Sequence, residues 1–347
     1  MIAVRPPSQE PAGALAEEFE DLPPGELDGG EPGQTEAPEV RAASVDVALH
    51  DWRLDKALAE LVPEFSRSYL QQLLAQGCVR LNGREAGKAS ARVKAGDAVE
   101  VEMRPTQQSQ AFRPESLPLD ILHEDEHLLV VNKPAGLVVH PAPGNWSGTL
   151  LNALLGRDPK AALVPRAGIV HRLDKDTSGV MVVARTRAAM DALVRMIAAR
   201  EVSRQYLALG WGAWSGAAHR EVDAPIGRDP RNRLRMAIVD LAAHSGKPAR
   251  TDVDVLSSGS DACLVRCTLH TGRTHQIRVH MASLKHPLVG DALYGGQAGA
   301  GLQRQALHAF RLAFRHPVTG ADLVFRAELP PDMAEALDFW ALRYNPA

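Results

Sequence analysis

The sequence predicts an α+β protein with two folded parts: a small unit of two helices and a β-hairpin, then a larger domain that mixes short strands with helices. Three observations support this fold class. The 347 residues suffice for two or three domains at about 100–200 residues each. Two leucine-rich helical patterns precede an Asn-Gly hairpin signal before residue 103. Beyond residue 118, strand and helix patterns alternate without the regular rhythm of a doubly wound sheet.

The overall composition is that of a soluble globular protein, with 45% hydrophobic and 23% charged residues. No run reaches the roughly 18 uncharged apolar residues of a membrane span. The amino-terminal segment lacks the apolar core of a secretory signal. The three cysteines, an odd number, do not make a disulfide framework. We therefore expect a cytoplasmic protein with no membrane partner.

Residues 1–43 are predicted to form a disordered acidic tail. The first 40 residues contain ten acids and one base and few large apolar side chains. The rest of the chain contains 38 bases and 32 acids, a net charge of +6. This mildly basic part is compatible with a polyanionic partner, although the charge alone does not establish one.

Residues 44–103 carry the pattern of the small unit. Apolar residues at the spacing of one helix face indicate a first helix, namely Leu54, Leu58, Leu61 and Val62. Pro63 ends that helix, and Ser66 can cap a second one. Asn82-Gly83 then predicts a tight turn between two strands.

The larger domain is expected over residues 119–330, after a polar, proline-containing linker at 104–118. Its clearest strands are predicted near residues 127–132, 180–184, 206–210 and 264–269, and its clearest helices near 149–155 and 187–199. Residues 331–347 predict a C-terminal helix.

Cys263 and Cys267 have a spacing that superficially suggests a metal site. On a strand, however, residues four apart are separated by roughly 13 Å, too far to share one zinc ion. We expect both thiols in the core. The chain also lacks the glycine-rich nucleotide loops and the G-x-S-x-G elbow, so ATP, dinucleotide and serine-hydrolase functions lose their usual support.

Four polar segments between apolar flanks could carry chemistry: residues 132–136, 168–179, 202–209 and 272–280 with 286–291. Each alone is compatible with a turn, a solvated loop, a core tyrosine or a helix start. Together they resemble the RluA-type family of pseudouridine synthases, most specifically through GIVHRLDKDTSG and GRTHQIRVH followed by HPLVGD. In the small unit, RLDKAL, SRS and GCVRLNG resemble the S4 RNA-binding domain. The resemblance covers roughly residues 44–330.

The resemblance implies an enzyme that isomerises uridine to pseudouridine in RNA, with no cofactor and no metal. It also implies a catalytic domain built on a largely antiparallel sheet. By motif position, Asp174 matches the family's essential aspartate. Tyr206 matches the tyrosine that stacks on the flipped base and acts at C5, and Arg278 matches the partner of the carboxylate. An opposite charge within roughly 4–6 Å would favour the ionised form of the Asp174 carboxylate. Ile277 is expected to wall the uracil pocket.

The same resemblance suggests residues that contact RNA. Beside the pocket these are His171, Arg172 and Arg273, and Arg172 is expected to fill the space that the flipped base leaves. In the S4-like unit they are Arg53, Arg67, Ser68 and Gln71. The last three lie near the start of the second helix, where free N–H groups favour a phosphate.

Residues 304–309 and His316-Pro317 look most like the branch of the family that modifies large-subunit ribosomal RNA. The expected partner is therefore 23S RNA or a pre-50S particle, with several uridines of one hairpin loop as targets and the protein as a monomer. Three alternatives stay open: the same chemistry at another large-subunit or transfer RNA site, a non-catalytic S4-type RNA-binding protein, and a hydrolase that uses Asp174 with His171 or His275. The intact Asp174, Tyr206 and Arg278 positions argue against the second.

Overall fold

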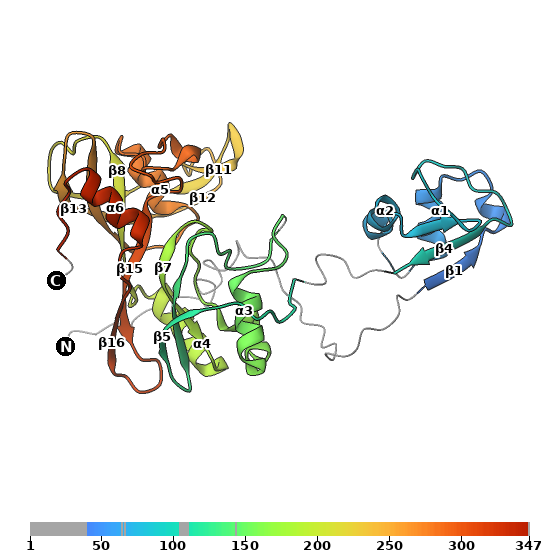
Figure 1. Cartoon of the computed structure of the whole chain (residues 1–347), viewed down its shortest axis with the longest axis horizontal. Coiled ribbons are helices and arrows are strands. Elements are labelled where there is room, and N and C mark those ends of the chain that lie inside the picture. Colours follow the sequence, from blue (N-terminus) through green and yellow to red (C-terminus); the bar gives the residue numbers. More distant parts are fainter. Residues whose placement is uncertain (1–39, 64, 66, 104–110, 143, 346–347) are drawn as a thin grey trace, which may run out of the picture. The chain divides into compact units, whose positions relative to one another are not determined.

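The structure, a computed structural model, describes residues 40–63, 65, 67–103, 111–142 and 144–345 (Figure 1). The side chains of Ser68 and Arg233 are also outside the described part. The chain divides into two compact units between Ala111 and Phe112. Residues 1–39, which make up most of the predicted acidic tail, lie outside the described residues.

The small unit contains the two predicted helices, α1 (Leu54–Leu61) and α2 (Arg67–Ala75). They pack on a four-stranded antiparallel sheet in the order β1 (Val40–Ser44), β4 (Ala98–Glu102), β2 (Val79–Leu81) and β3 (Arg84–Glu85). Leu54, Leu58 and Leu70 are fully buried against Val79 and Val101 of that sheet. The helix–helix–hairpin prediction is therefore confirmed.

The predicted end of the tail at residue 43 is wrong in one respect, because residues 40–43 belong to β1. This strand pairs along the whole of β4, from Val40 opposite Glu102 to Ser44 opposite Ala98. Its side chains are almost all exposed, so it has no hydrophobic alternation to reveal it. It forms because its backbone satisfies the free N–H and C=O groups along the edge of β4.

The larger unit is built on one sheet in the order β5, β6, β7, β15, β8, β14, β13 and β9, with β16 pairing with β15. Their bounds are β5 (Asp120–Glu124), β6 (Leu128–Lys133), β7 (Ser178–Ala184), β8 (Ser203–Trp211), β9 (His219–Asp223), β13 (Arg250–Ser258), β14 (Ala262–Leu269), β15 (Leu307–Arg315) and β16 (Asp322–Arg326). Among the described strands, only β7 and β15 pair in parallel. The prediction of a largely antiparallel sheet is confirmed.

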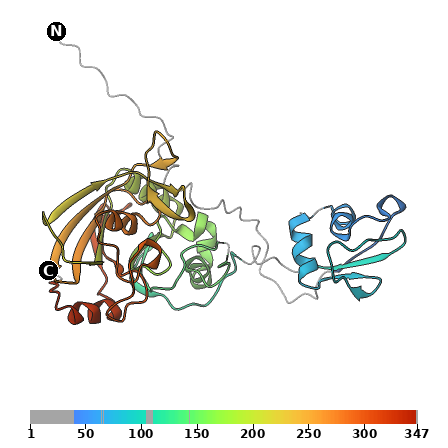
Figure 2. The same cartoon turned by 90° about the horizontal axis from the view of Figure 1, so that it is seen from above.

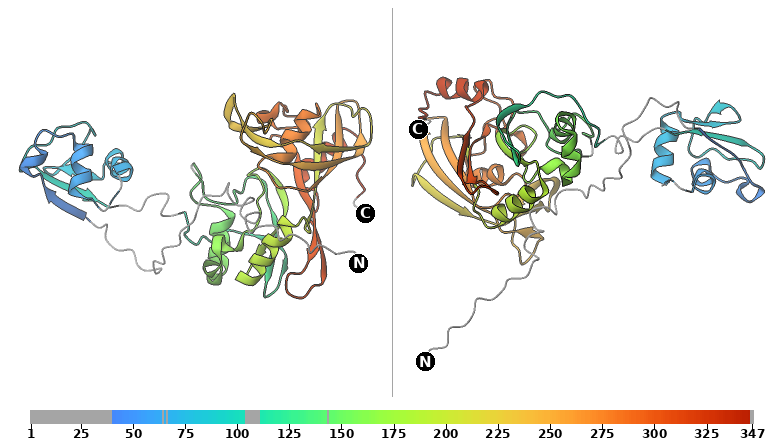
Figure 3. Two further views of the ribbon diagram at one scale, coloured as in Figure 1. Left: turned by 180° about the vertical axis from the view of Figure 1, so that it is seen from behind. Right: turned by 90° about the horizontal axis from the view of Figure 1, so that it is seen from below.

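Helices cover both faces of this sheet (Figures 2 and 3). Side chains of α3 (Leu150–Arg157) and α5 (Gln276–Ser283) pack on one face with Leu129 and Val131 of β6. Side chains of α4 (Arg187–Ala198) pack on the other face with Leu128 and Val130, the alternate residues of the same strand. The C-terminal helix α6 (Pro331–Phe339) packs against β8 and β14.

Smaller elements complete the larger unit. They are a three-stranded sheet of β10 (Ile226–Asp229), β11 (Asn232–Ile238) and β12 (Gly246–Lys247), and the short 3₁₀ helices η3 (Pro159–Leu163), η4 (Pro165–Gly168) and η5 (Ala292–Tyr294). The small unit has one such helix, η2 (Val47–Leu49). No helix in the described part of the chain is long and apolar enough to cross a membrane.

Two predicted boundaries differ from the structure. Residues 112–118, expected in the linker, contact the larger unit: the Glu115 carboxylate accepts a hydrogen bond from the Gly148 N–H, and the Asn152 side chain donates to the Arg113 carbonyl. The C-terminal helix ends at Phe339, well before residue 347. Polar linker residues can gain such contacts only from segments distant in sequence, which local patterns do not reveal.

Candidate active site

One cavity of about 80 Å³ collects all the site residues that we predicted in the larger unit. Its walls come from the loop before β7, from β8, from the end of β14, from the start of α5 and from Leu307 of β15. The predicted residues that line it are His171, Arg172, Asp174, Tyr206, Arg273, Ile277 and Arg278. Segments more than 100 residues apart in the sequence therefore meet at one place.

Arg278 connects two carboxylates at this cavity. Its Nη1 atom lies 3.2 Å from Oδ2 of Asp174, as the resemblance implied. Its Nε and Nη2 atoms donate to both oxygens of Asp291, at 2.7 and 2.8 Å. Burial alone would lower the pKa of Arg278, but the hydrogen bonds and charge of Asp291 and the charge of Asp174 raise it above its usual value. The guanidinium is thus fixed before any substrate binds.

Asp291 was not among the predicted site residues. Its side chain is only 1% exposed and forms the stronger of the two pairs with Arg278. The sequence does contain a signal, because Asp291 ends the HPLVGD segment, which carries part of the family resemblance. Its partner could not be predicted, since the helix α5 and the turn at 286–291 come together only in the folded chain.

The loop that carries Asp174 is held through its backbone. The carbonyl of Lys175 accepts hydrogen bonds from Nζ of Lys133, at 3.0 Å, and from the N–H of Gly136, at 2.9 Å. The carbonyl of Asp176 accepts from Nη1 of Arg304, at 3.0 Å. These contacts fix the residues that follow Asp174 without using any side chain of the loop.

Lys133 belongs to the predicted polar segment 132–136, but the sequence assigns it no role, because Lys-Pro-x-Gly after a strand resembles an ordinary turn. It is 1% exposed, and its Nζ atom donates to the carbonyls of Pro134, Leu137 and Lys175. Burial lowers the pKa of Lys133 to about 7, against the charges of Asp174 and Asp176, which raise it.

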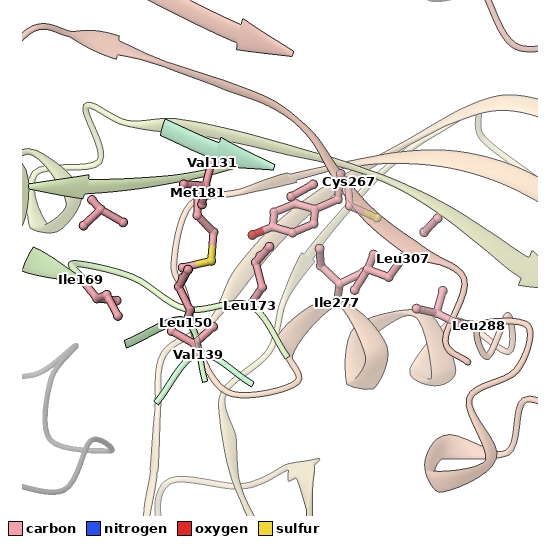
Figure 4. Close-up of a cluster of buried hydrophobic side chains, with 14 of the residues drawn as sticks. Val131, Val139, Leu150, Ile169, Leu173, Met181, Cys267, Ile277, Leu288 and Leu307 are labelled. Carbon is pink, nitrogen blue, oxygen red and sulfur yellow. The ribbon is translucent and has the colours of Figure 1, made fainter. Parts of the chain in front are cut away.

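Tyr206 lies on β8 opposite Cys267 of β14 and is 6% exposed. Burial raises the pKa of Tyr206 to about 12, so its hydroxyl stays protonated near neutral pH. The labelled side chains Leu173, Ile277 and Leu307 gather beside Cys267 in the same apolar cluster (Figure 4). Leu173, Ile277 and Leu307 also line the cavity and give it an apolar wall, while the expected contact of Ile277 with uracil stays a prediction.

The predicted RNA-contacting residues of this unit differ in character. Nε2 of His171 accepts a hydrogen bond from the Val182 N–H, and burial together with the charge of Arg204 lowers the pKa of His171 to about 3. His171 is therefore neutral near pH 7 and offers no cationic contact to a phosphate, although it lines the cavity. Arg172 is exposed at the edge of the cavity, whereas Nε of Arg273 donates to the Pro248 carbonyl at 3.1 Å.

In the small unit, the predicted contact residues converge on a carboxylate that the sequence did not reveal. The Asp55 side chain is 2% exposed and accepts hydrogen bonds from Arg53, Arg67 and Gln71. The two arginine side chains are 44% and 50% exposed, so each keeps N–H groups open to solvent. Asp55 thus orients both of them. The side chain of Ser68 lies outside the described residues.

The cysteines belong to the core, as expected. Cys263 and Cys267 are fully buried in β14, and burial raises the pKa of both thiols, that of Cys263 to about 11. Within the described residues, no group of three or more His, Cys, Asp and Glu side chains could hold a metal ion.

Comparison with known proteins gives two family matches. Residues 127–283 match the RNA pseudouridylate synthase family, and residues 52–99 match the S4 domain. Ribosomal large subunit pseudouridine synthase D of Nitrosomonas europaea is 49% identical over 82% of this chain and 83% of its own length. The protein of the same name from Xanthomonas campestris pv. campestris is 48% identical over 89% of this chain and 94% of its own length. The solved structure of human RNA pseudouridylate synthase domain containing 1 is 29% identical, with a TM-score of 0.50, and covers 63% of this chain and 87% of that chain.

Proposed function

The chain belongs to the RNA pseudouridylate synthase family, with an S4 domain, and we propose that it isomerises uridines of large-subunit ribosomal RNA to pseudouridine at the cavity around Asp174. The resemblance that the motifs indicated is thereby confirmed. One observation carries the placement of the site: the Asp174 carboxylate, 3.2 Å from a prearranged Arg278, opens into a cavity with an apolar wall.

The reaction breaks the C1′–N1 bond of uridine, turns the uracil, and joins C5 to C1′, while the proton on C5 leaves and N1 gains one. Atoms balance without a donor or an oxidant. The target must first leave its stack, at a cost of a few kcal/mol. We assign Asp174 as the carboxylate that acts on the nucleotide, with Arg278 stabilising its charge. Ile277 and Leu307 offer the apolar surface for the uracil.

Tyr206 fits a role in the late proton step. Since its pKa is raised to about 12, it acts as a neutral hydroxyl that takes up the C5 proton while passing its own proton to solvent, rather than as a phenolate. Tyr206→Phe should bind RNA but form almost no pseudouridine. Tritium release from C5 of a labelled target uridine measures this step. Wild-type release by the Phe variant, with loss in Tyr206→Ala, would leave the ring with a packing role only.

The finer assignments rest on the same reasoning. The exposed N–H groups of Arg53 and Arg67 suit phosphate contacts that position the RNA and carry no chemistry. Arg172 and Arg273 suit the backbone beside the flipped base. We propose that a cytoplasmic monomer acts on several uridines of one 23S RNA loop, free or in a pre-50S particle.

The deciding experiment compares Asp174→Asn with Asp176→Asn, a matched change two residues further along the same loop. Each purified variant is incubated with large-subunit ribosomal RNA, and pseudouridines are mapped along the RNA. We expect the wild type and Asp176→Asn to modify the same uridines, and Asp174→Asn to modify none while binding RNA with similar affinity. Pseudouridine formation by Asp174→Asn would overturn the assignment. Release of free uracil would favour a hydrolase instead.

A further inference from the structure

His275 stands at the cavity in a backbone conformation that few side chains adopt. It precedes the first residue of α5 with φ 58° and ψ 21°, in the left-handed region. Non-glycine residues held there tend to mark functional sites, because the surrounding structure must maintain them. The ring lines the cavity, and its Nε2 atom lies 3.9 Å from Oδ2 of Asp174. This distance is too long for a hydrogen bond.

The other ring nitrogen of His275 is engaged by Tyr294. Nδ1 of His275 and the Tyr294 hydroxyl are 2.8 Å apart, and the same hydroxyl accepts a hydrogen bond from the Met236 N–H at 2.9 Å. Because a backbone N–H can only donate, the hydroxyl keeps its own proton free for Nδ1. A donating hydroxyl with an accepting Nδ1 gives this proton a partner, so this is the arrangement that the geometry favours.

These two hydrogen bonds favour one position for the imidazole proton of His275. Burial lowers the pKa of His275, so the ring is neutral and carries one proton. With Nδ1 as the acceptor, that proton is on Nε2, which faces Asp174. The opposite tautomer would turn a lone pair toward the Asp174 carboxylate and leave the phenol proton without a partner among the described residues.

The segment Asp291–Tyr294 contacts both Arg278 and His275, the two cavity side chains beside Asp174. Tyr294 ends the short helix η5, which begins directly after Asp291, the bidentate partner of Arg278. The guanidinium carbon of Arg278 also lies 5.0 Å from the centre of the Tyr294 ring. One short segment thus orients the Arg278 cation and, through the hydroxyl, the His275 donor.

We propose that His275 is a further substrate-binding residue, whose Nε2–H donates a hydrogen bond to an oxygen atom of the nucleotide held against Asp174, and that Tyr294 is a positioning residue that sets the tautomer of His275. The 3.9 Å separation leaves this donor available to a substrate oxygen between the two side chains. The inference rests on the proposed function for the identity of the substrate, but the tautomer is a property of the free protein.

The first test reads the tautomer directly. ¹⁵N spectra of histidine-labelled protein should show His275 as neutral, with the proton on Nε2. Tyr294→Phe should mix the two tautomers, whereas Tyr344→Phe, which removes a hydroxyl elsewhere in the unit, should leave the spectrum unchanged. A proton on Nδ1 in the wild type, or no change in Tyr294→Phe, would overturn the proposal. No RNA is needed, so this result is independent of whether the wild type makes pseudouridine.

The second test measures activity on large-subunit ribosomal RNA. Tyr294→Phe should lower kcat/KM by about ten-fold, the loss expected for one hydrogen bond of ordinary strength, while Tyr344→Phe stays at the wild-type value. His275→Gln retains a donor that does not depend on Tyr294, and His275→Met retains only the bulk. We expect Gln to keep more activity than Met, and Tyr294→Phe to have no further effect in the Gln background. Equal activities of the Gln and Met variants would refute the donor role, even if Tyr294→Phe did not fold.

Discussion

Replacing Arg278 with methionine removes the group that joins the two carboxylates of the site. The change deletes the bidentate pair with Asp291 and the 3.2 Å contact with Asp174, while methionine occupies much of the same space. Because the Arg278 and Asp291 side chains are 9% and 1% exposed, water can replace little of the pair with Asp291. Asp291 would remain buried beside an uncharged neighbour.

The expected loss of stability follows from that burial. Removing one partner of a buried pair costs about 3–5 kcal/mol, since it leaves an uncompensated buried charge. In a unit of this size, 1 kcal/mol shifts Tm by about 2–4 °C, so we expect Tm to fall by roughly 6–20 °C. Pseudouridine formation should be lost at temperatures where the variant is still folded, because Asp174 no longer has a cation beside it.

Urea unfolding can isolate the larger unit from the small one. Trp52 is the only tryptophan in residues 40–103, and the other four tryptophans lie beyond residue 118. In a Trp52→Phe background, tryptophan fluorescence therefore reports the larger unit alone. Measuring the midpoint and the slope together shows whether the variant changed stability or the two-state behaviour.

Two further variants decide whether the reasoning holds. Arg187→Met breaks an exposed pair with Asp191 and should cost no more than about 0.5 kcal/mol. The double variant Arg278→Met/Asp291→Leu removes both partners of the buried pair, so it should regain most of the stability and still lack activity. A double variant as unstable as Arg278→Met, or an Arg278→Met protein that melts with the wild type, would refute the account.

Three other predictions concern separate parts of the chain. Gly168→Ala should lower the free energy of unfolding in urea by about 2–4 kcal/mol, because φ is +79° and a Cβ would lie 1.7 Å from the Ala184 carbonyl oxygen. The control Gly301→Ala, at φ +80° with nothing within 4 Å of the new Cβ, should lower it by about 1 kcal/mol. Burial alone would raise the pKa of Asp125, but hydrogen bonds from His123 and from the backbone of residues 127–128 lower it to about 2. Asp125 therefore contributes about 2 kcal/mol to the free energy of unfolding above pH 4, and this contribution is lost as the pH falls toward 2. The unfolding midpoint of Asp125→Asn should lack this part of the pH dependence. Arg67→Ala should weaken RNA binding equally for all sequences and reduce the slope of log Kd against log salt by about 1, and an unchanged slope would exclude a phosphate contact.

The predicted strands and helices correspond to segments whose apolar residues follow one period over their length. β6, β7, β8 and β14 were found within three residues at each end, as were α3 and α4. The sequence does not predict β9, because four of its five residues are exposed and the single buried residue, Val222, makes no alternating pattern in HREVD. β1 was missed for the same reason. Both strands form because a neighbouring strand has a free edge.

In the site, the residues to which we assign the chemistry could be placed from short motifs, but the residues that support them could not. Asp174 and Arg278 lie 104 positions apart and meet at 3.2 Å, a pairing known in advance only through the family resemblance. Lys133 and Asp55 look like a turn lysine and a helix-start aspartate until burial surrounds them with partners. A buried charge is defined by what folds over it, and a local sequence pattern does not contain that information.

The way the Asp174 loop is held explains how a loop can carry a residue that must be placed accurately. Lys133, at the end of β6, donates a hydrogen bond to the Lys175 carbonyl, and Arg304, in the segment before β15, donates one to the Asp176 carbonyl. Arg304 is in turn fixed by both oxygens of Asp332 in the first turn of α6. Lys133 and Arg304 bind the loop backbone, and Asp332 binds Arg304. None of these contacts uses the Asp174 side chain, which faces the cavity. Burying such groups does not by itself favour stability, and their hydrogen bonds here go to the backbone beside Asp174, so we infer that they serve the geometry of the site.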